Sequence, residues 1–255
     1  DTGRQCIWIG TEGYLFQYFP STGQMKQTEA FHNNSIKSLA LDGNGDLLAG
    51  TDNGLYVYHN DVTPLQHIIH DSRNIQSLTN NIIWNIFADQ EHNIWLGTDY
   101  GISLSRYNSA LQFIPISQIT GTGDGNQFYS LFRDSKGFYW FGGTNGLIRF
   151  TDPAGDKHNA IWYRMGDKTY PLSHNRIRHI YEDKEQQLWI ATDGSINRYD
   201  YATRQFVHYN IVDSTGTYNT NWTYYMFEDN AGHLWISTCL GGIFVVDKHR
   251  LMQSA

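Results

Sequence analysis

The chain has 255 residues, a formal net charge of −7, 40% hydrophobic residues and 17% charged residues. An acidic chain without a run of Lys and Arg is not expected to bind nucleic acid, because that binding needs clustered positive charge. No apolar stretch approaches the roughly 20 residues of a membrane-spanning helix. The sequence begins in mid-pattern at Asp1 without a signal peptide, so we expect it to be a part of a longer protein.

One sequence unit recurs along the chain. It consists of a short apolar run, an Asp, a turn, an aromatic-led strand, a small-residue turn, and Gly before another apolar strand. A truncated copy begins at Cys6, and fuller copies begin at Ile36, Ile83, Phe128, Ile177 and Thr223. The Asp recurs every 45 to 49 residues, at Asp42, Asp89, Asp134, Asp183 and Asp229. A period of this length indicates a repeat architecture.

Two further positions keep a fixed distance from this Asp. Six residues after it, the fuller copies have Leu48, Trp95, Trp140, Trp189 and Trp235, and the truncated copy contributes Trp8. Eight residues before it, they have Asn34, Asn81, Asn126, Asn175 and Asn221. We predict that the Trp packs as an apolar plate against the neighbouring unit, that the Asp bonds its own turn, and that the Asn caps the start of the innermost strand.

Each period contains four strand-like runs and no helical periodicity. In the third copy these runs are Ile83–Ala88, Ile94–Gly97, Gly101–Tyr107 and Gln112–Ile116. Four strands in such a period are typical of a β-propeller blade, whose two faces are covered by the neighbouring blades. We therefore predict an all-β fold, a β-propeller of four-stranded antiparallel blades.

The predicted blades do not close a ring. Residues 1–255 are predicted to form a single propeller fragment with blade units at residues 1–33, 34–80, 81–125, 126–174, 175–220 and 221–255. The first copy lacks its innermost strand and the last lacks its outermost strand. About five and a half blades with about 22 strands remain, against about 28 strands for a seven-bladed propeller.

The repeat resembles a known family. The pattern Asn-x-Ile…Asp-x-x-Gly-x-Leu-Trp-Ile-Gly-Thr-x-x-Gly-Leu, closely matched by Asn80–Leu104, is similar to the two-component regulator propeller repeat. The resemblance extends through six copies and departs from the family at Leu48 and at Ala191. It implies the periplasmic sensor region of a hybrid two-component histidine kinase, notably of gut Bacteroidetes. Such sensors typically carry two seven-bladed propellers, a β-sandwich, a membrane helix, kinase domains and a DNA-binding output.

The resemblance also implies a role and partners. Such sensors generally detect breakdown products of polysaccharides, so this part is expected to be a non-enzymatic sensing module in signal transduction. The implied partners are an oligosaccharide or other small ligand, the remaining blades and β-sandwich of the parent chain, and a second copy in a homodimer. Two alternatives stay open: a structural or dimerisation scaffold that relays the signal without binding ligand, and a lyase or hydrolase on a propeller scaffold, like the streptogramin lyases, which use His with Mg²⁺.

Positions that vary between copies indicate where a ligand would bind. They lie seven and five residues before each Asp, at the axis-facing start of the innermost strand. The candidate ligand-binding residues are Lys37, Trp84, Tyr129, Arg176, Arg178, Trp222 and Tyr224. Aromatic rings stack on the C–H faces of sugars, and Arg binds hydroxyl or carboxylate groups through two N–H groups. The alternative is that these side chains only line and pack the mouth of the ring.

No catalytic residue, metal or cofactor is predicted. The stretch from Asp42 to Asp46 resembles the start of a calcium loop, but Leu47 stands where Gly is needed, so we interpret it as a turn. The eleven histidines form no metal-binding pair, and no nucleophile elbow or Cys–His pair is visible. Cys6 and Cys239 fall at different points of the repeat, so a disulfide between them is not expected.

Overall fold

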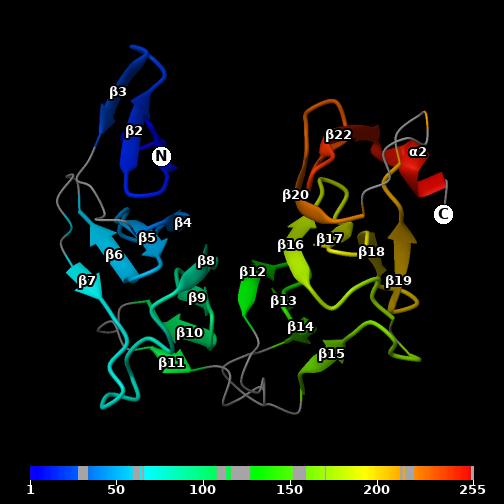
Figure 1. Cartoon of the computed structure of the whole chain (residues 1–255), viewed down its shortest axis with the longest axis horizontal. Helices are drawn as coiled ribbons and strands as arrows, with labels where there is room; N and C mark the ends of the chain where they lie inside the picture. The colour runs from blue at the N-terminus through cyan, green and yellow to red at the C-terminus, as the bar shows by residue number, and fades with distance from the viewer. Residues whose placement is uncertain are drawn as a thin grey trace. The chain divides into compact units, whose positions relative to one another are not determined.

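The computed structural model describes residues 1–27, 34–59, 64, 66–107, 113–115, 127–151, 159–169, 171–212, 215 and 221–253. These residues form 22 strands and one short helix, α2 (Lys248–Gln253). The chain divides into two compact units, Asp1–Phe128 and Tyr129–Ala255, and each is described by itself. In both units every sheet is built from strands that follow one another in the sequence (Figure 1).

The first unit contains three sheets in chain order. The first sheet has the strands β1 (Ile7–Gly10), β2 (Leu15–Phe19) and β3 (Gln24–Gln27). The second sheet has β4 (Ile36–Leu41), β5 (Leu47–Thr51), β6 (Gly54–Tyr58) and β7 (Gln66–Ile68). The third sheet has β8 (Ile83–Ala88), β9 (Ile94–Thr98), β10 (Gly101–Ser105) and β11 (Ile114–Pro115).

The second unit contains the other three sheets. The fourth sheet has β12 (Phe128–Arg133), β13 (Tyr139–Gly143), β14 (Gly146–Phe150) and β15 (Ile161–Tyr163). The fifth sheet has β16 (Ile177–Glu182), β17 (Leu188–Thr192), β18 (Ile196–Asp200) and β19 (Gln205–Tyr209). The sixth sheet has β20 (Thr223–Glu228), β21 (His233–Thr238) and β22 (Gly242–Asp247), and α2 follows it.

The predicted fold class is confirmed. The strands form antiparallel sheets of three or four, one per sequence repeat, and the first and last sheets have three strands, as the truncated copies predicted. The assignment of the whole chain to a single propeller fragment with the blade boundaries given above stays a prediction, because the two units are described separately.

The Asp of each repeat organises the turn between the first two strands of its sheet. In Asp183, Oδ1 accepts the N–H groups of Glu185 and Gln187, both at 2.9 Å. The equivalent pair of bonds forms at Asp42, Asp89, Asp134 and Asp229. The second oxygen, Oδ2, accepts the indole N–H of the Trp six residues later, at 2.8 Å from Trp95, 2.7 Å from Trp140, 2.9 Å from Trp189 and 2.9 Å from Trp235. One carboxylate therefore fixes both the turn and the Trp.

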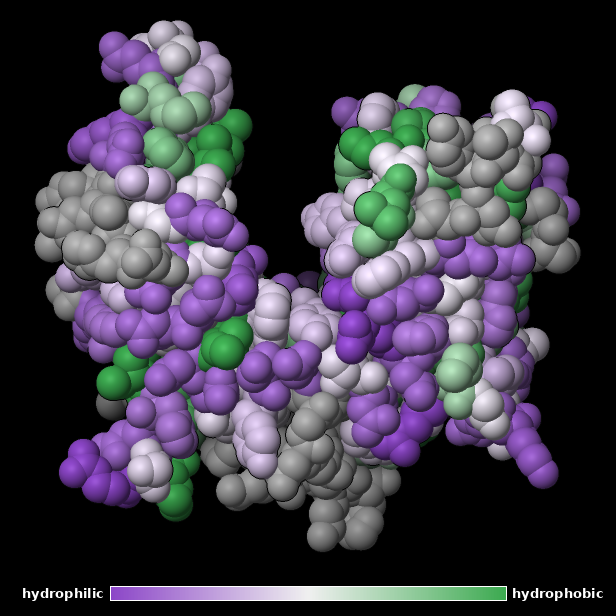
Figure 2. Space-filling model, viewed as in Figure 1, coloured by the Kyte–Doolittle hydropathy of each residue, from purple (hydrophilic) through white to green (hydrophobic). Residues whose placement is uncertain are grey.

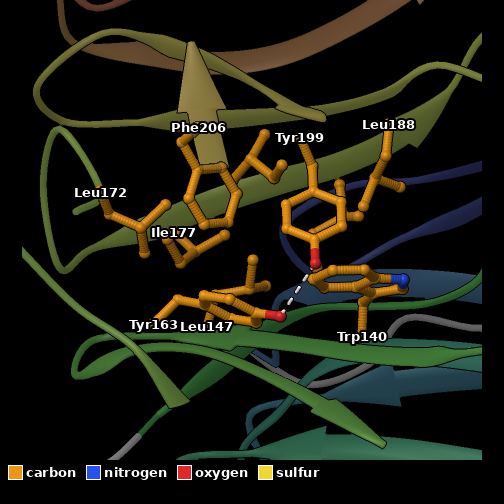
Figure 3. Packing of buried hydrophobic residues seen from close by; sticks show 10 residues of the cluster. Trp140, Leu147, Tyr163, Leu172, Ile177, Leu188, Tyr199 and Phe206 are labelled. Atoms are coloured by element: carbon orange, nitrogen blue, oxygen red, sulfur yellow. Dashed lines mark hydrogen bonds between the residues drawn. The ribbon is translucent and has the colours of Figure 1, made fainter. Parts of the chain in front are cut away.

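The Trp fixed in this way packs against the next sheet. Trp140 is 0% exposed, and its ring lies 5.8 Å from the ring of Tyr163 and 5.0 Å from that of Tyr199 on β18 of the following sheet. The hydroxyl groups of Tyr163 and Tyr199 are 3.2 Å apart, and Phe206 closes the cluster beside them (Figure 3). Trp8 of the truncated copy is half-buried and donates its indole N–H to Asp1 Oδ2 at 3.1 Å.

The recurrent Asn connects consecutive sheets. The side-chain Oδ1 accepts an N–H from the segment that follows the outermost strand of the preceding sheet, at 2.6 Å from His70 to Asn81, 2.7 Å from Met165 to Asn175 and 3.0 Å from Ile211 to Asn221. The backbone carbonyl groups of Asn34, Asn81 and Asn175 accept the N–H of a turn glycine in the preceding sheet. The bonds of this Asn therefore run to the preceding sheet. Asn126 lies outside the described residues.

A second recurrent bond joins the innermost strands of neighbouring sheets. The N–H of Ile86 donates to Ser38 Oγ at 3.0 Å, and the N–H of Ile180 donates to Ser130 Oγ at 3.0 Å. At the same repeat position of the fifth sheet stands His179, whose Nδ1 accepts the N–H of Met226 at 3.3 Å. Its ring also stacks on Tyr225, with the centroids 3.9 Å apart. His179 must be neutral at Nδ1 to accept this bond.

We expect His179 to make the stability of the chain depend on pH. Burial lowers the pKa of His179 to about 4, from 6.5. The pKa of His179 is lower in the folded chain than in the unfolded chain. The stability that neutral His179 contributes is therefore complete above pH 6.5 and is lost as the pH falls toward 4. The full loss of unfolding free energy is about 3 kcal/mol. Urea unfolding at pH 7, 5.5 and 4 measures it. The matched variant is His179→Ser, which places at this position the residue that the fourth sheet has there, Ser130. If the stability of this variant depends on pH as steeply, His179 is not the cause of the pH dependence.

The described surface is mostly polar. In the space-filling view hydrophilic residues predominate, and hydrophobic residues gather in small separate patches (Figure 2). Among the described residues, no helix has the length and hydropathy of a membrane-spanning segment.

Candidate functional site

The structure brings four of the predicted ligand-binding residues together in the second unit. The guanidinium carbon of Arg178, on β16, lies 5.5 Å from the ring of Tyr129 on β12 and 4.8 Å from the ring of Tyr224 on β20. It lies 5.6 Å from the ring of Trp222, which precedes β20. These distances are within the reach of cation–π attraction. The innermost strands of three consecutive sheets therefore contribute to one aromatic cluster around one Arg.

The central Arg is held by a carboxylate of its own sheet. Arg178 Nε lies 2.7 Å from Asp193 Oδ1, and Nη2 lies 3.1 Å from Oδ2, which is a two-point ion pair. Burial would lower the pKa of Arg178, but the bonds to Asp193 outweigh it and raise the pKa. The Arg178 side chain is 15% exposed. It is therefore a permanent cation, and two of its N–H groups bond to Asp193.

Two rings of this cluster remain accessible, and a fifth predicted residue, Arg176, joins the cluster through Asp193. Trp222 is 39% exposed and Tyr224 is 40% exposed, and their rings stack with centroids 6.0 Å apart and an interplanar angle of 25°. The Arg176 side chain is 44% exposed, and its Nη1 lies 3.8 Å from Asp193 Oδ2, beyond hydrogen-bond distance. With two Arg and one Asp the cluster has a net positive charge. The accessible parts are therefore an aromatic surface and one guanidinium.

The first unit contains a smaller arrangement at the same repeat positions. Lys37 Nζ lies 2.9 Å from Asp52 Oδ1 and 4.3 Å from the centre of the Trp84 ring. The Trp84 indole N–H donates to Asp99 Oδ1 at 2.5 Å. Lys37 and Trp84 thus form a cation–π pair, and each is bonded to an Asp of its own sheet.

Sequence reasoning missed the three carboxylates of these sites. Asp52, Asp99 and Asp193 each stand fifteen residues after their partner, in the Thr-Asp turn between the second and third strands. The sequence interpretation treated this turn only as a chain reversal. The available signal was that the fourth and sixth copies have Thr144 and Cys239 at the same position. The Asp is therefore not needed for the turn itself.

The described residues do not form a metal site. Within the ranges that the structure describes, no group of three His, Cys, Asp or Glu residues gathers in a way that could hold a metal ion. Cys6 and Cys239 are free thiols. The lyase alternative required several His at one site, so it receives no support from the described part of the chain.

The repeats match a known family. The two-component regulator propeller family matches residues 77–100, 122–145 and 171–194, which cover the turns of Asp89, Asp134 and Asp183. The chain therefore contains repeats of the two-component regulator propeller family. The Asn, Asp and Trp whose hydrogen bonds are described above are thus the framework of these propeller repeats.

Solved structures place these propeller repeats in a larger context. The chain is 93% identical over its whole length to part of the extracellular domain of a hybrid two-component system of B. thetaiotaomicron, with a TM-score of 0.53. It is 21% identical, over 98% of its length, to the extracellular domain of a second such system of B. thetaiotaomicron, with a TM-score of 0.77, which shows the shared fold. The chain spans about a third of each of these domains, 34% and 33%.

A curated relative is similar to most of the chain. The chain is 26% identical over 241 residues to a histidine kinase, P4, of Formosa agariphila. The match covers 85% of the chain and 16% of the kinase. The chain therefore corresponds to a small part of this relative.

Proposed function

We propose that the chain is part of the periplasmic sensor region of a hybrid two-component histidine kinase, and that it binds an oligosaccharide derived from a polysaccharide. The observation that carries the first part is the 93% identity to an extracellular domain of such a system along the whole chain. The kinase activity and the DNA-binding output belong to other parts of the parent protein in this proposal.

The accessible residues of the second unit support the ligand part of the proposal. Trp222 and Tyr224 offer stacked rings that are 39% and 40% exposed, which suits the C–H faces of a sugar. Arg176, which shares Asp193 with Arg178, has a side chain that is 44% exposed, and its guanidinium suits a carboxylate. The ligand that fits both features is an oligosaccharide containing a uronic acid. Arg178, already paired with Asp193, positions the rings in this proposal.

The last sheet supports further blades as partners. Phe227, Ile243 and Val245 are 44%, 67% and 49% exposed, and Phe227 and Val245 flank Trp235 in the strand register. At the same repeat position of the fifth sheet, Trp189 is fully buried against the sixth sheet. In our proposal a further blade of the parent chain covers this apolar face, and the parent receptor acts as a homodimer that also carries a β-sandwich.

We expect the chain to bind acidic oligosaccharides more tightly than neutral ones of equal length. Isothermal titration calorimetry against plant, mucin and host oligosaccharides measures this. Trp222→Ala should weaken binding about tenfold through the lost stacking, and Arg176→Gln should remove the preference for acidic sugars. The control is Trp162→Ala, because this ring lies on β15 and contacts Arg164 instead. If neither the chain nor the longer extracellular domain gives saturable heat with any sugar, the ligand part of the proposal is wrong.

A scaffold without ligand is the second candidate. The two-point pairing of Arg178 with Asp193 and its contacts with three rings are what a purely structural cluster would also show. In that case Trp222→Ala would leave signalling by the full receptor unchanged.

A further inference from the structure

The second repeat lacks the Trp indole that donates a hydrogen bond to the turn Asp in the later repeats. Its turn residue Asp42 accepts the N–H groups of Asn44 and Asp46 through Oδ1, both at 2.8 Å, as in the other repeats. Six residues later stands Leu48 in place of Trp. Within the described ranges, no side chain donates a hydrogen bond to the second oxygen, Oδ2, of Asp42. Asp42 is half-buried, and it lines a cavity in the first unit.

The interface between the fourth and fifth sheets shows what is missing. There Asp134 Oδ2 accepts two bonds, from the Trp140 indole at 2.7 Å and from the Tyr201 hydroxyl of the next sheet at 2.7 Å. By repeat position, Tyr107 corresponds to Tyr201. The Tyr107 ring instead packs on His92, with the centroids 5.1 Å apart.

A second substitution enlarges the same space. Tyr199, which packs on Trp140 with the ring centroids 5.0 Å apart, corresponds by repeat position to Ser105. Two large aromatic side chains of the fourth and fifth sheets are therefore replaced by Leu48 and Ser105 between the second and third sheets. Both replacements remove volume from the same interface.

A cavity occupies this place in the first unit. Its volume is about 170 Å³, and Leu48, Leu55, Val57, Ile94 and Phe113 form its apolar walls. Asp42 and Ser105 also line it. A cavity of about 150 Å³ with apolar walls is large enough to hold benzene. The rest of the lining is polar or aromatic and consists of Asn44, Asp46, Gln66, His92, Arg106 and Tyr107. The size and the apolar part of the walls thus match a flat ring system, and Asp42 offers an acceptor to a ring N–H.

We propose that this cavity is a binding site for an indole-like aromatic heterocycle, whose ring N–H donates to Asp42 Oδ2. The ligand takes the place that the indole of the missing Trp would have. The apolar walls favour the ring by burial, and the carboxylate favours a ligand with an N–H over one of equal shape without it, because the bond is charge-assisted. This site is separate from the aromatic cluster around Arg178 and does not depend on the proposed sugar ligand.

The first test compares two ligands on the full 255-residue chain. Indole should bind saturably in calorimetry and in ligand-observed NMR, whereas 1-methylindole, which has nearly the same shape but no N–H, should bind at least about tenfold more weakly. Equal affinity for the two ligands, or no saturable binding of indole up to its solubility limit, would overturn the proposal.

Variants test the position of the ligand. Leu48→Trp supplies the missing indole and should abolish indole binding. Asp42→Asn should weaken binding about tenfold while it keeps an acceptor for the turn. The matched control is Asp71→Asn, which should change the affinity less than about twofold, because this carboxylate is not part of the cavity lining and bonds to Arg73 instead. If indole still binds to a folded Leu48→Trp chain, the ligand binds elsewhere and the proposal is wrong. If Leu48→Trp does not fold, the results with Asp42→Asn and with 1-methylindole decide the proposal.

Discussion

Replacing Trp140 with alanine is expected to lower the unfolding free energy by about 3–5 kcal/mol, the range for a fully buried Trp in a well-packed site. The side chain is 0% exposed, and it contacts both its own sheet and the next one through Tyr163 and Tyr199. Its removal opens a cavity between two sheets and leaves Asp134 Oδ2 with only the Tyr201 hydroxyl. Both effects act at the contact that holds consecutive sheets together.

Urea unfolding followed by far-ultraviolet circular dichroism measures this change without relying on the fluorescence of the removed Trp. The variant Trp140→Leu has the residue that the second repeat has at this position. Its unfolding free energy is expected to fall less than that of Trp140→Ala, because Leu keeps part of the apolar contact. The control is Trp222→Ala, because this side chain is 39% exposed and its removal opens no enclosed cavity. If Trp140→Ala and Trp222→Ala destabilise the chain equally, the buried Trp does not hold the sheets together.

The sequence predicted the fold well because the repeat is local. The turn at each Asp, the strands on either side of it and the Trp six residues later all lie within one repeat, and five copies repeat the same spacing. The strand predicted at Ile83–Ala88 has the bounds of β8, and the predicted Ile94–Gly97 differs from β9 by one residue. A recurrent spacing of this kind predicts hydrogen bonds within one repeat, such as those from Glu185 and Gln187 to Asp183.

The contacts between repeats were harder to predict. The variable positions include residues that share a cluster in the second unit, because Tyr129, Arg178 and Tyr224 occupy one repeat position in consecutive copies. Ligand binding by these residues stays a prediction. The sequence did not indicate that Asp193 engages Arg178, because an Asp in a turn is explained by the turn alone. The cavity beside Leu48 also depends on Ser105 from another repeat, so the departure at Leu48 by itself did not reveal it.

A buried lysine is another feature that only the structure shows. Lys248 begins α2 and its side chain is 1% exposed. Its Nζ lies 3.2 Å from Asp183 Oδ2 and 3.0 Å from Glu228 Oε1, and these two carboxylate side chains are 0% and 4% exposed. Burial would lower the pKa of Lys248, but the bonds to Glu228 and Asp183 outweigh it and raise the pKa. This Lys neutralises carboxylates of the fifth and sixth sheets and ties the C-terminal helix to them.

Lys248→Met is expected to lower the unfolding free energy by about 3–5 kcal/mol, because it keeps the apolar stem but leaves two buried carboxylates without their cation. The stability difference from the unmodified chain, measured by urea unfolding, should shrink as the pH falls from 7 to 4, since a buried carboxylate that has lost its cation takes up a proton more readily. The contribution of His179 is common to both chains and cancels in this difference. Lys184→Met is the control, because the Nζ of this exposed Lys donates to Asp229 O and Asn230 Oδ1, and its removal should cost less than about 0.5 kcal/mol. A large loss that stays constant between pH 7 and 4 would mean that Lys248 acts through packing and not through its charge.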